Sequence, residues 1–142
     1  MILIFGGTTE GRTAVKVLDE AGSPYYYSTR GNAQQIECKH GTRVAGGMDC
    51  DAMTEFCSTH NIRLIIDAAH PFASLLHTTV ATVSEQLDLP VIRLERRYPP
   101  RDESLVWCDT FDDAIDYLES HEIRDLLALS GVQTITKLQR YW

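Results

Sequence analysis

The sequence has 142 residues, of which 44% are hydrophobic and 23% charged, and its formal net charge is -7. This composition indicates a folded, soluble protein of one domain, or one domain and part of another. The acidic balance argues against nucleic-acid binding, which needs an excess of Lys and Arg. No apolar run approaches the ~20 residues of a membrane span, and the start MILIFGG lacks a signal peptide's basic residues. We therefore expect a cytoplasmic protein that does not bind membranes.

Strand and helix patterns alternate along the first 97 residues. Amphipathic stripes predict helices; Asp49 can cap one of them, and Pro71 suits the first turn of another. Short apolar or β-branched runs predict five strands, at residues 2–5, 24–29, 42–45, 63–67 and 89–94. Strands that alternate with helices indicate right-handed βαβ units. The fold class is therefore α/β, with a Rossmann-like parallel sheet and flanking helices.

The pattern changes after residue 97. The polar segment RRYPPRDES is typical of a linker. Beyond it we expect strands at 105–108 and 126–129, a helix that begins with the capping box Thr110 and Asp113, and a last helix from about Gln133. We therefore divide the chain into an NADP(H)-binding domain of residues 1–97 and the beginning of a second α/β domain, residues 98–142, which we expect to be truncated.

The strongest chemical signal is the turn GGTTEG at residues 6–11, directly after the first strand. Compared with the dinucleotide pattern G-x-G-x-x-G, Gly6 and Gly11 match the first and third glycines, and Thr8 stands at the second. We predict that Gly6 allows the tight turn, that Gly11 allows close helix packing, and that Thr8 faces the pyrophosphate. The helix N-terminus would supply N–H groups for that anion. The alternative is a glycine turn that binds no dinucleotide.

The second strand ends in Ser28, Thr29 and Arg30. An NAD site needs Asp or Glu there for the ribose 2′-hydroxyl, whereas two hydroxyls and a guanidinium suit a 2′-phosphate. The turn therefore predicts NADPH as the cofactor, with NADH possible. The alternative is that Arg30 is an ordinary solvated loop residue.

His70 follows the fourth strand, in the segment DAAHPFA at 67–73. Ligands of open parallel sheets bind beyond the carboxyl ends of the strands, so His70 would lie at a ligand site and could give or take a proton. The alternative is that His70 is an ordinary loop residue.

Four arginines lie close together in one short segment at the end of the fifth strand and beyond it: Arg93, Arg96, Arg97 and Arg101, with Glu95 the one acid among the first three. Positive charge in an otherwise acidic chain favours a polyanionic ligand. The alternative is a solvated run of charges with a salt bridge to Glu95.

Together with VIRLER at 91–96 and LSGVQTITKL at 129–138, the segments GGTTEG and DAAHPFA resemble the precorrin-6A reductases of cobalamin biosynthesis. That family usually carries GGT-x-E-G, D-A-[TS]-H-P-[FY]-A and R-L-E-R after its first, fourth and fifth strands, and Ala69 here replaces Thr or Ser. The resemblance implies two Rossmann-like domains around a cleft. It also implies that NAD(P)H reduces a double bond of precorrin-6A, or of its cobalt complex, to give the 6B form.

The resemblance also assigns residues. His70 is the one candidate proton donor, and no metal site is expected. The substrate carboxylates would contact Arg93, Arg96 and Arg97. The cofactor would contact the residues Gly6, Gly7, Thr8, Thr9, Glu10, Ser28, Thr29, Arg30, His70, Pro71, Phe72 and Ala73.

Two other functions stay open. One is a different NADP-dependent Rossmann oxidoreductase, although the Tyr-x-x-x-Lys pair of short-chain dehydrogenases does not occur in this sequence. The other is a dinucleotide-binding module without catalysis. The sequence predicts a small-molecule substrate and no particular oligomeric state.

Overall fold

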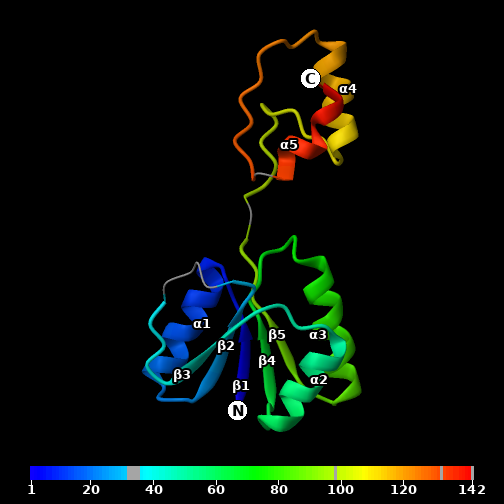
Figure 1. Ribbon diagram of the computed structural model, residues 1–142. Coiled ribbons are helices and arrows are strands. Elements are labelled where there is room, and N and C mark those ends of the chain that lie inside the picture. The colour runs from blue at the N-terminus through cyan, green and yellow to red at the C-terminus, as the bar shows by residue number, and fades with distance from the viewer. Residues whose placement is uncertain (32–35, 98, 132, 142) are drawn as a thin grey trace. The chain divides into compact units, whose positions relative to one another are not determined.

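The computed structural model describes residues 1–31, 36–97, 99–131 and 133–141. The chain divides into two compact units, Met1–Arg97 and Tyr98–Trp142, whose secondary structure is drawn in Figure 1. Within the described ranges, no helix is both long enough and apolar enough to cross a lipid bilayer.

The first unit is built on five parallel strands with three helices. The strands are β1 (Ile2–Phe5), β2 (Tyr25–Thr29), β3 (Gly41–Ala45), β4 (Leu64–Asp67) and β5 (Val91–Arg93). The helices are α1 (Thr9–Glu20), α2 (Cys50–Thr59) and α3 (Ser74–Gln86). The sheet order β3-β2-β1-β4-β5 is that of a Rossmann fold. The predicted Rossmann-like parallel sheet is therefore confirmed.

The two faces of the sheet pack on different helices because successive strand residues point to opposite sides. One face joins Ile4, Tyr27 and Ile66 to Ala14 and Val15 of α1. The other face joins residues of β1 and β4 to α2 and α3, and its buried members are Leu3, Phe5, Met53, Cys57, Ile62, Ile65, Ala69, Val80 and Val83. Both faces of the central strands are thus covered, as their unbroken apolar runs require.

The helix starts show one prediction confirmed and one wrong. Asp49 caps α2 as predicted, with its Oδ1 accepting from the Ala52 N–H at 2.9 Å. The prediction that Pro71 lies in the first turn of α3 is wrong, because α3 begins at Ser74. Instead, the Ala73 N–H donates to the His70 carbonyl at 2.8 Å. This bond closes a four-residue turn in which proline occupies the second position that it favours.

The second unit contains α4 (Phe111–Ser120), α5 (Gln133–Lys137) and a short 3-10 helix, η1 (Gln139–Tyr141). The predicted capping box is confirmed, since the Thr110 hydroxyl accepts from the Asp113 N–H while the Asp113 carboxylate accepts from the Thr110 N–H.

The strands predicted at 105–108 and 126–129 are wrong, because no described residue of this unit belongs to a strand. A strand needs a hydrogen-bonded neighbour. Instead, Leu105, Val106 and Leu127 are exposed, Leu127 to 81%. The apolar runs are real, but they find no sheet to join within the described residues.

Candidate functional site

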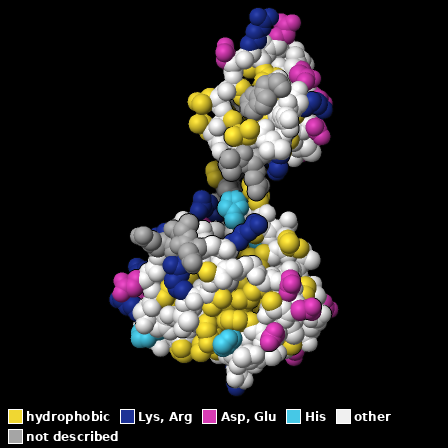
Figure 2. Space-filling view, viewed as in Figure 1, with side chains coloured by type: hydrophobic (Ala, Val, Ile, Leu, Met, Phe, Trp, Pro, Cys, Tyr) yellow, Lys and Arg dark blue, Asp and Glu magenta, His cyan; other side chains and the backbone are white. Residues whose placement is uncertain are grey.

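The strand register brings the predicted site residues to one edge of the sheet. Phe5 of β1 pairs with Ser28 of β2 and with Asp67 of β4, and Asp67 pairs with Arg93 of β5. Because all strands are parallel, these four residues form a row at the carboxyl edge. Figure 2 shows Lys and Arg side chains together with a His side chain at this end of the first unit.

The glycine turn between β1 and α1 is shaped by Tyr27, which is fully buried. The Gly7 N–H donates to the Tyr27 hydroxyl at 3.0 Å, and Gly7 has a φ of 98°, which favours glycine. A Cβ on Gly6 would lie 2.3 Å from the Tyr27 ring, and a Cβ on Gly11 would lie 2.9 Å from the Gly6 Cα. The close packing predicted for Gly11 is therefore present. The positive φ lies at Gly7, whereas Gly6 is needed because the tyrosine ring touches it.

Thr8 connects the turn to the neighbouring strand. Its hydroxyl accepts from the Gly11 N–H at 3.1 Å, which caps α1, and it donates to the Ala68 carbonyl at 2.6 Å, just beyond β4. The hydroxyl predicted to face a pyrophosphate thus already has two partners within the protein. The N–H group of Thr9, in the first turn of α1, has no acceptor within the helix and suits an anion, whereas the N–H group of Glu10 is hydrogen-bonded to the carboxylate of Glu10 itself.

Glu10 and Arg96 form an ion pair at the N-terminus of α1. The Arg96 Nε lies 3.1 Å from a Glu10 carboxylate oxygen, and its Nη2 lies 3.4 Å from the Thr9 hydroxyl. The hydrogen bond from Arg96 is the main cause that lowers the pKa of Glu10 below its ordinary value. Arg96 therefore offsets a negative charge that would otherwise oppose an anionic ligand here.

The turn after β2 presents less hydroxyl surface than predicted. Ser28 and Thr29 are buried, and the Thr29 hydroxyl donates to the Gly31 carbonyl at 2.8 Å. Arg30 is exposed. A second guanidinium, that of Arg43 in β3, lies 3.5 Å from the Thr29 hydroxyl. Among the described residues, the arginines at this end of β2 are thus Arg30 and Arg43, and the sequence did not predict Arg43.

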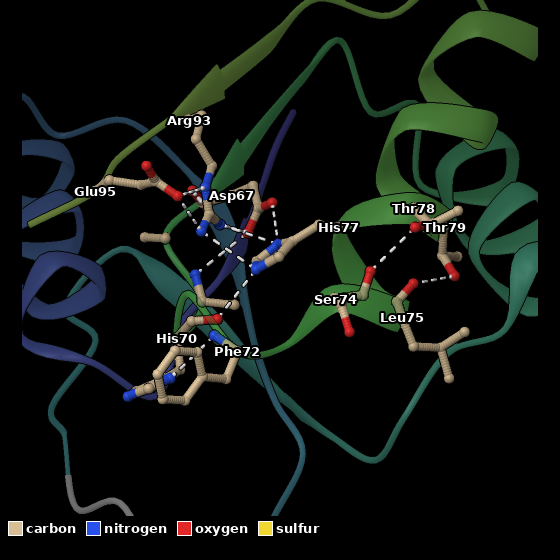
Figure 3. A network of polar contacts seen from close by, with 12 residues as sticks. Asp67, His70, Phe72, Ser74, Leu75, His77, Thr78, Thr79, Arg93 and Glu95 are labelled. Atoms are coloured by element: carbon tan, nitrogen blue, oxygen red, sulfur yellow. Dashed lines mark hydrogen bonds and ion pairs between the residues drawn. The ribbon is translucent and has the colours of Figure 1, made fainter. Parts of the chain in front are cut away.

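A buried carboxylate organises the end of β4 (Figure 3). The Asp67 side chain is 4% exposed; its Oδ1 lies 2.7 Å from Nη1 of Arg93 and its Oδ2 lies 2.7 Å from Nδ1 of His77. Arg93 also binds Glu95 at 2.8 Å. His77 was not predicted as a site residue. If the helix began at Pro71, His77 would be its seventh residue. Because α3 begins at Ser74, His77 is its fourth residue and lies near the carboxyl edge of the sheet.

The turn from His70 to Ala73 carries exposed groups at the same edge. The Nδ1 of His70 accepts from the Phe72 N–H at 3.2 Å, so a neutral His70 ring carries its proton on Nε2. The rings of His70 and Phe72 lie 5.0 Å apart, and Phe72 is 88% exposed. His70 thus offers an N–H, and Phe72 an apolar face, to a ligand.

The arginine cluster is not a single positive patch. Arg93 and Arg96 have carboxylate partners in the first unit, where Arg97 is exposed. Arg101 belongs to the second unit, pairs with Asp109 at 3.1 Å and stacks over Trp107. The predicted excess positive charge is therefore largely balanced by carboxylates. Among the described residues, no group of His, Cys, Asp and Glu side chains could hold a metal ion.

The sheet order, the glycine turn and the residues gathered beyond the strand ends define the first unit as a Rossmann-like α/β unit. Over residues 1–142 the chain matches the family model described as precorrin-6x reductase CbiJ/CobK. The chain therefore belongs to the precorrin-6x reductase family.

Named relatives agree with this membership. The chain is 30% identical to a precorrin-6A reductase of Rhodococcus erythropolis, across 99% of this chain and 59% of the relative. It is 30% identical to a cobalt-precorrin-6A reductase of Synechocystis, across 70% of this chain and 38% of the relative. A solved structure of CobK precorrin-6A reductase shares the fold, with a TM-score of 0.68 and 24% identity over 81% of this chain and 46% of that one. The chain thus spans about two fifths to three fifths of the length of these relatives.

Proposed function

We propose that this chain binds NADPH through its first unit and forms the cofactor-binding part of a cytoplasmic enzyme that reduces precorrin-6A, or its cobalt complex, to the 6B form. The observation that carries the proposal is the glycine turn between β1 and α1, which places the N-terminus of α1 at the carboxyl edge of the sheet. Family membership supports the reaction. Residues 98–142 would contribute to a second domain.

The residues present fit a dinucleotide. The N–H group of Thr9 at the N-terminus of α1 would contact the diphosphate, with Arg96 offsetting the Glu10 carboxylate. Arg30, together with Arg43, would contact a 2′-phosphate beyond β2. The turn from His70 to Ala73 would line the site of the nicotinamide.

When bound, the nicotinamide supplies the hydride, so the protein has to orient the reactants and deliver a proton. His70 can hold a proton at Nε2, because its Nδ1 accepts from the Phe72 N–H. The exposed Phe72 ring can exclude water beside it. Arg97, which is exposed, and Arg96 would bind carboxylates of the tetrapyrrole precursor.

A thermal-unfolding experiment tests the cofactor. We expect NADPH to raise the melting temperature more than NADH, because Arg30 and Arg43 would contact the 2′-phosphate. A ligand at 100 times its Kd stabilises the folded protein by about 2.7 kcal/mol. Arg30→Asp should reduce the difference between the two cofactors. Arg63→Asp is the matched control, because Arg63 lies just before β4, at the opposite edge of the sheet. Equal shifts with both cofactors would remove the NADPH preference, and no shift with either would remove dinucleotide binding.

A second candidate function is a dinucleotide-binding module without catalysis. The carboxylate partners of Arg93 and Arg96 favour it, since these guanidinium groups are already engaged. Oxidation of NADPH by this chain in the presence of precorrin-6A would exclude the module.

A further inference from the structure

Both nitrogens of the His77 ring lie within hydrogen-bond distance of an oxygen atom. Its Nδ1 lies 2.7 Å from the Asp67 Oδ2, and its Nε2 lies 3.0 Å from the main-chain oxygen of His70. Both partners are acceptors, and they belong to different segments: the end of β4 and the turn beyond it. The His77 ring therefore ties the turn to the sheet (Figure 3).

Arg93 fixes the ring in this orientation. Its guanidinium nitrogens lie 3.0 Å from Nδ1 and 3.2 Å from Nε2 of His77. The guanidinium of Arg93 is thus within hydrogen-bond distance of both ring nitrogens. Its ion pairs with Asp67 and Glu95 hold the guanidinium in turn.

The carbonyl that His77 contacts is the one on which the turn closes. The same His70 oxygen accepts from the Ala73 N–H at 2.8 Å. Within this turn, the Phe72 N–H donates to the His70 Nδ1 at 3.2 Å. This one oxygen thus holds the turn that carries the His70 ring and the Phe72 side chain, the two groups that the turn presents to a ligand.

We propose that His77 is a positioning residue, which acts through the His70 carbonyl to hold the turn from His70 to Ala73 in the shape that binds NADPH. The ligand half of this proposal rests on the proposed function. The positioning half concerns the protein alone, so the two can be tested separately.

Three variants separate the two contacts of His77. In His77→Asn the amide nitrogen can take the place of Nδ1 and donate to Asp67, but it does not extend to the His70 carbonyl. In His77→Gln the longer side chain brings an amide N–H to the place of Nε2, where it can donate to that carbonyl. His77→Ala removes both contacts. Thr78→Ala is the control, because the Thr78 hydroxyl donates within α3 to the Ser74 carbonyl.

The first measurement is amide hydrogen exchange by NMR without any ligand. We expect the Phe72 and Ala73 amides to exchange about tenfold faster in His77→Ala and His77→Asn, because local opening costs less free energy there. His77→Gln and Thr78→Ala should stay near the wild-type rates. Amides of β1 and β4 should exchange alike in all these proteins if the sheet is unaffected.

The second measurement is NADPH affinity by isothermal titration calorimetry. We expect about tenfold weaker binding in His77→Ala and His77→Asn, the loss typical of one hydrogen bond that orders a site. Recovery of the affinity in His77→Gln is the result that a merely structural contact with Asp67 would not give.

Several results would overturn the proposal. Wild-type exchange rates at Phe72 and Ala73 in His77→Asn would show that His77 does not hold the turn. If His77→Asn binds NADPH as tightly as His77→Gln or more tightly, the effect of His77 comes from its contact with Asp67 alone. If faster exchange leaves NADPH affinity unchanged, the turn does not position the ligand. If the wild type binds no NADPH, the proposed function fails while the exchange rates still decide the positioning role. If His77→Ala does not fold, the comparison of Asn with Gln decides both points.

Discussion

The two charges of Asp67 and Arg93 should have a larger coupling energy than those of an exposed ion pair. Their N–O distance is 2.7 Å, and the two side chains are 4% and 28% exposed. The second unit offers a matched control in Arg101 and Asp109, which lie 3.1 Å apart with side chains 65% and 79% exposed. The two pairs have the same chemistry but differ in their access to water and in their neighbours, since Asp67 also contacts His77 and Arg101 also stacks over Trp107.

The expected magnitude follows from that difference. Two charges 4 Å apart attract by about 4 kcal/mol at an effective dielectric constant of 20. The partial exposure of Arg93 and its second partner, Glu95, reduce this value, so we expect a coupling energy of about 1.5–3 kcal/mol. The exposed pair of Arg101 and Asp109 should give about 0.5 kcal/mol or less.

A double-mutant cycle measures both couplings. The variants are Asp67→Asn, Arg93→Gln and their combination, with Asp109→Asn and Arg101→Gln treated in the same way. Because the chain has two compact units, stability is best read from native-state hydrogen exchange, using amides of β1 and β4 for the first pair and of α4 for the second. Coupling energies that agree within about 0.5 kcal/mol would refute the reasoning that burial sets the strength of the pair.

Two further predictions concern the N-terminus of α1. Arg96→Gln should raise the pKa of Glu10, because the hydrogen bond that lowers it is lost; an NMR titration of the Glu10 carboxyl measures this, and an unchanged pKa would contradict the contact. Since the folded pKa is depressed, the stabilisation from this pair is present above the ordinary pKa of glutamate and is lost as the pH falls through the lowered one. Gly11→Ala should destabilise the first unit by about 1–3 kcal/mol through overpacking against the Gly6 Cα, despite the better helix propensity of alanine. Gly47→Ala is the control, because a Cβ there meets nothing within 4 Å, and its free energy of unfolding in urea should change little. An equal loss of free energy of unfolding in the two variants would contradict the packing argument.

Periodicity predicted the sheet because it reports burial. Each of the five strands lies within two residues of its predicted bounds, and β1 matches them fully. The predictions of strands at 105–108 and 126–129 were wrong because an apolar run indicates only a tendency to be buried. A strand also needs a neighbouring strand to pair with, which a local pattern does not reveal.

The site was predicted less completely than the sheet. Its segments were found, because parallel strands place their carboxyl ends at one edge. The contacts between Glu10 and Arg96, and among Asp67, His77 and Arg93, depend on strand register and on the start of α3. An error of three residues at Pro71 was enough to hide His77. Boundaries of elements thus decide which side chains meet, although they matter little for the fold class.

The division of the chain at residue 97 has an optical consequence. Both tryptophans of the sequence, Trp107 and Trp142, lie beyond that boundary, whereas the sheet and its glycine turn lie before it. Fluorescence excited selectively at tryptophan therefore comes from residues of the second unit. Tyrosines 25, 26 and 27 all lie in β2, so a single tyrosine-to-tryptophan substitution there would add a separate optical probe of the first unit.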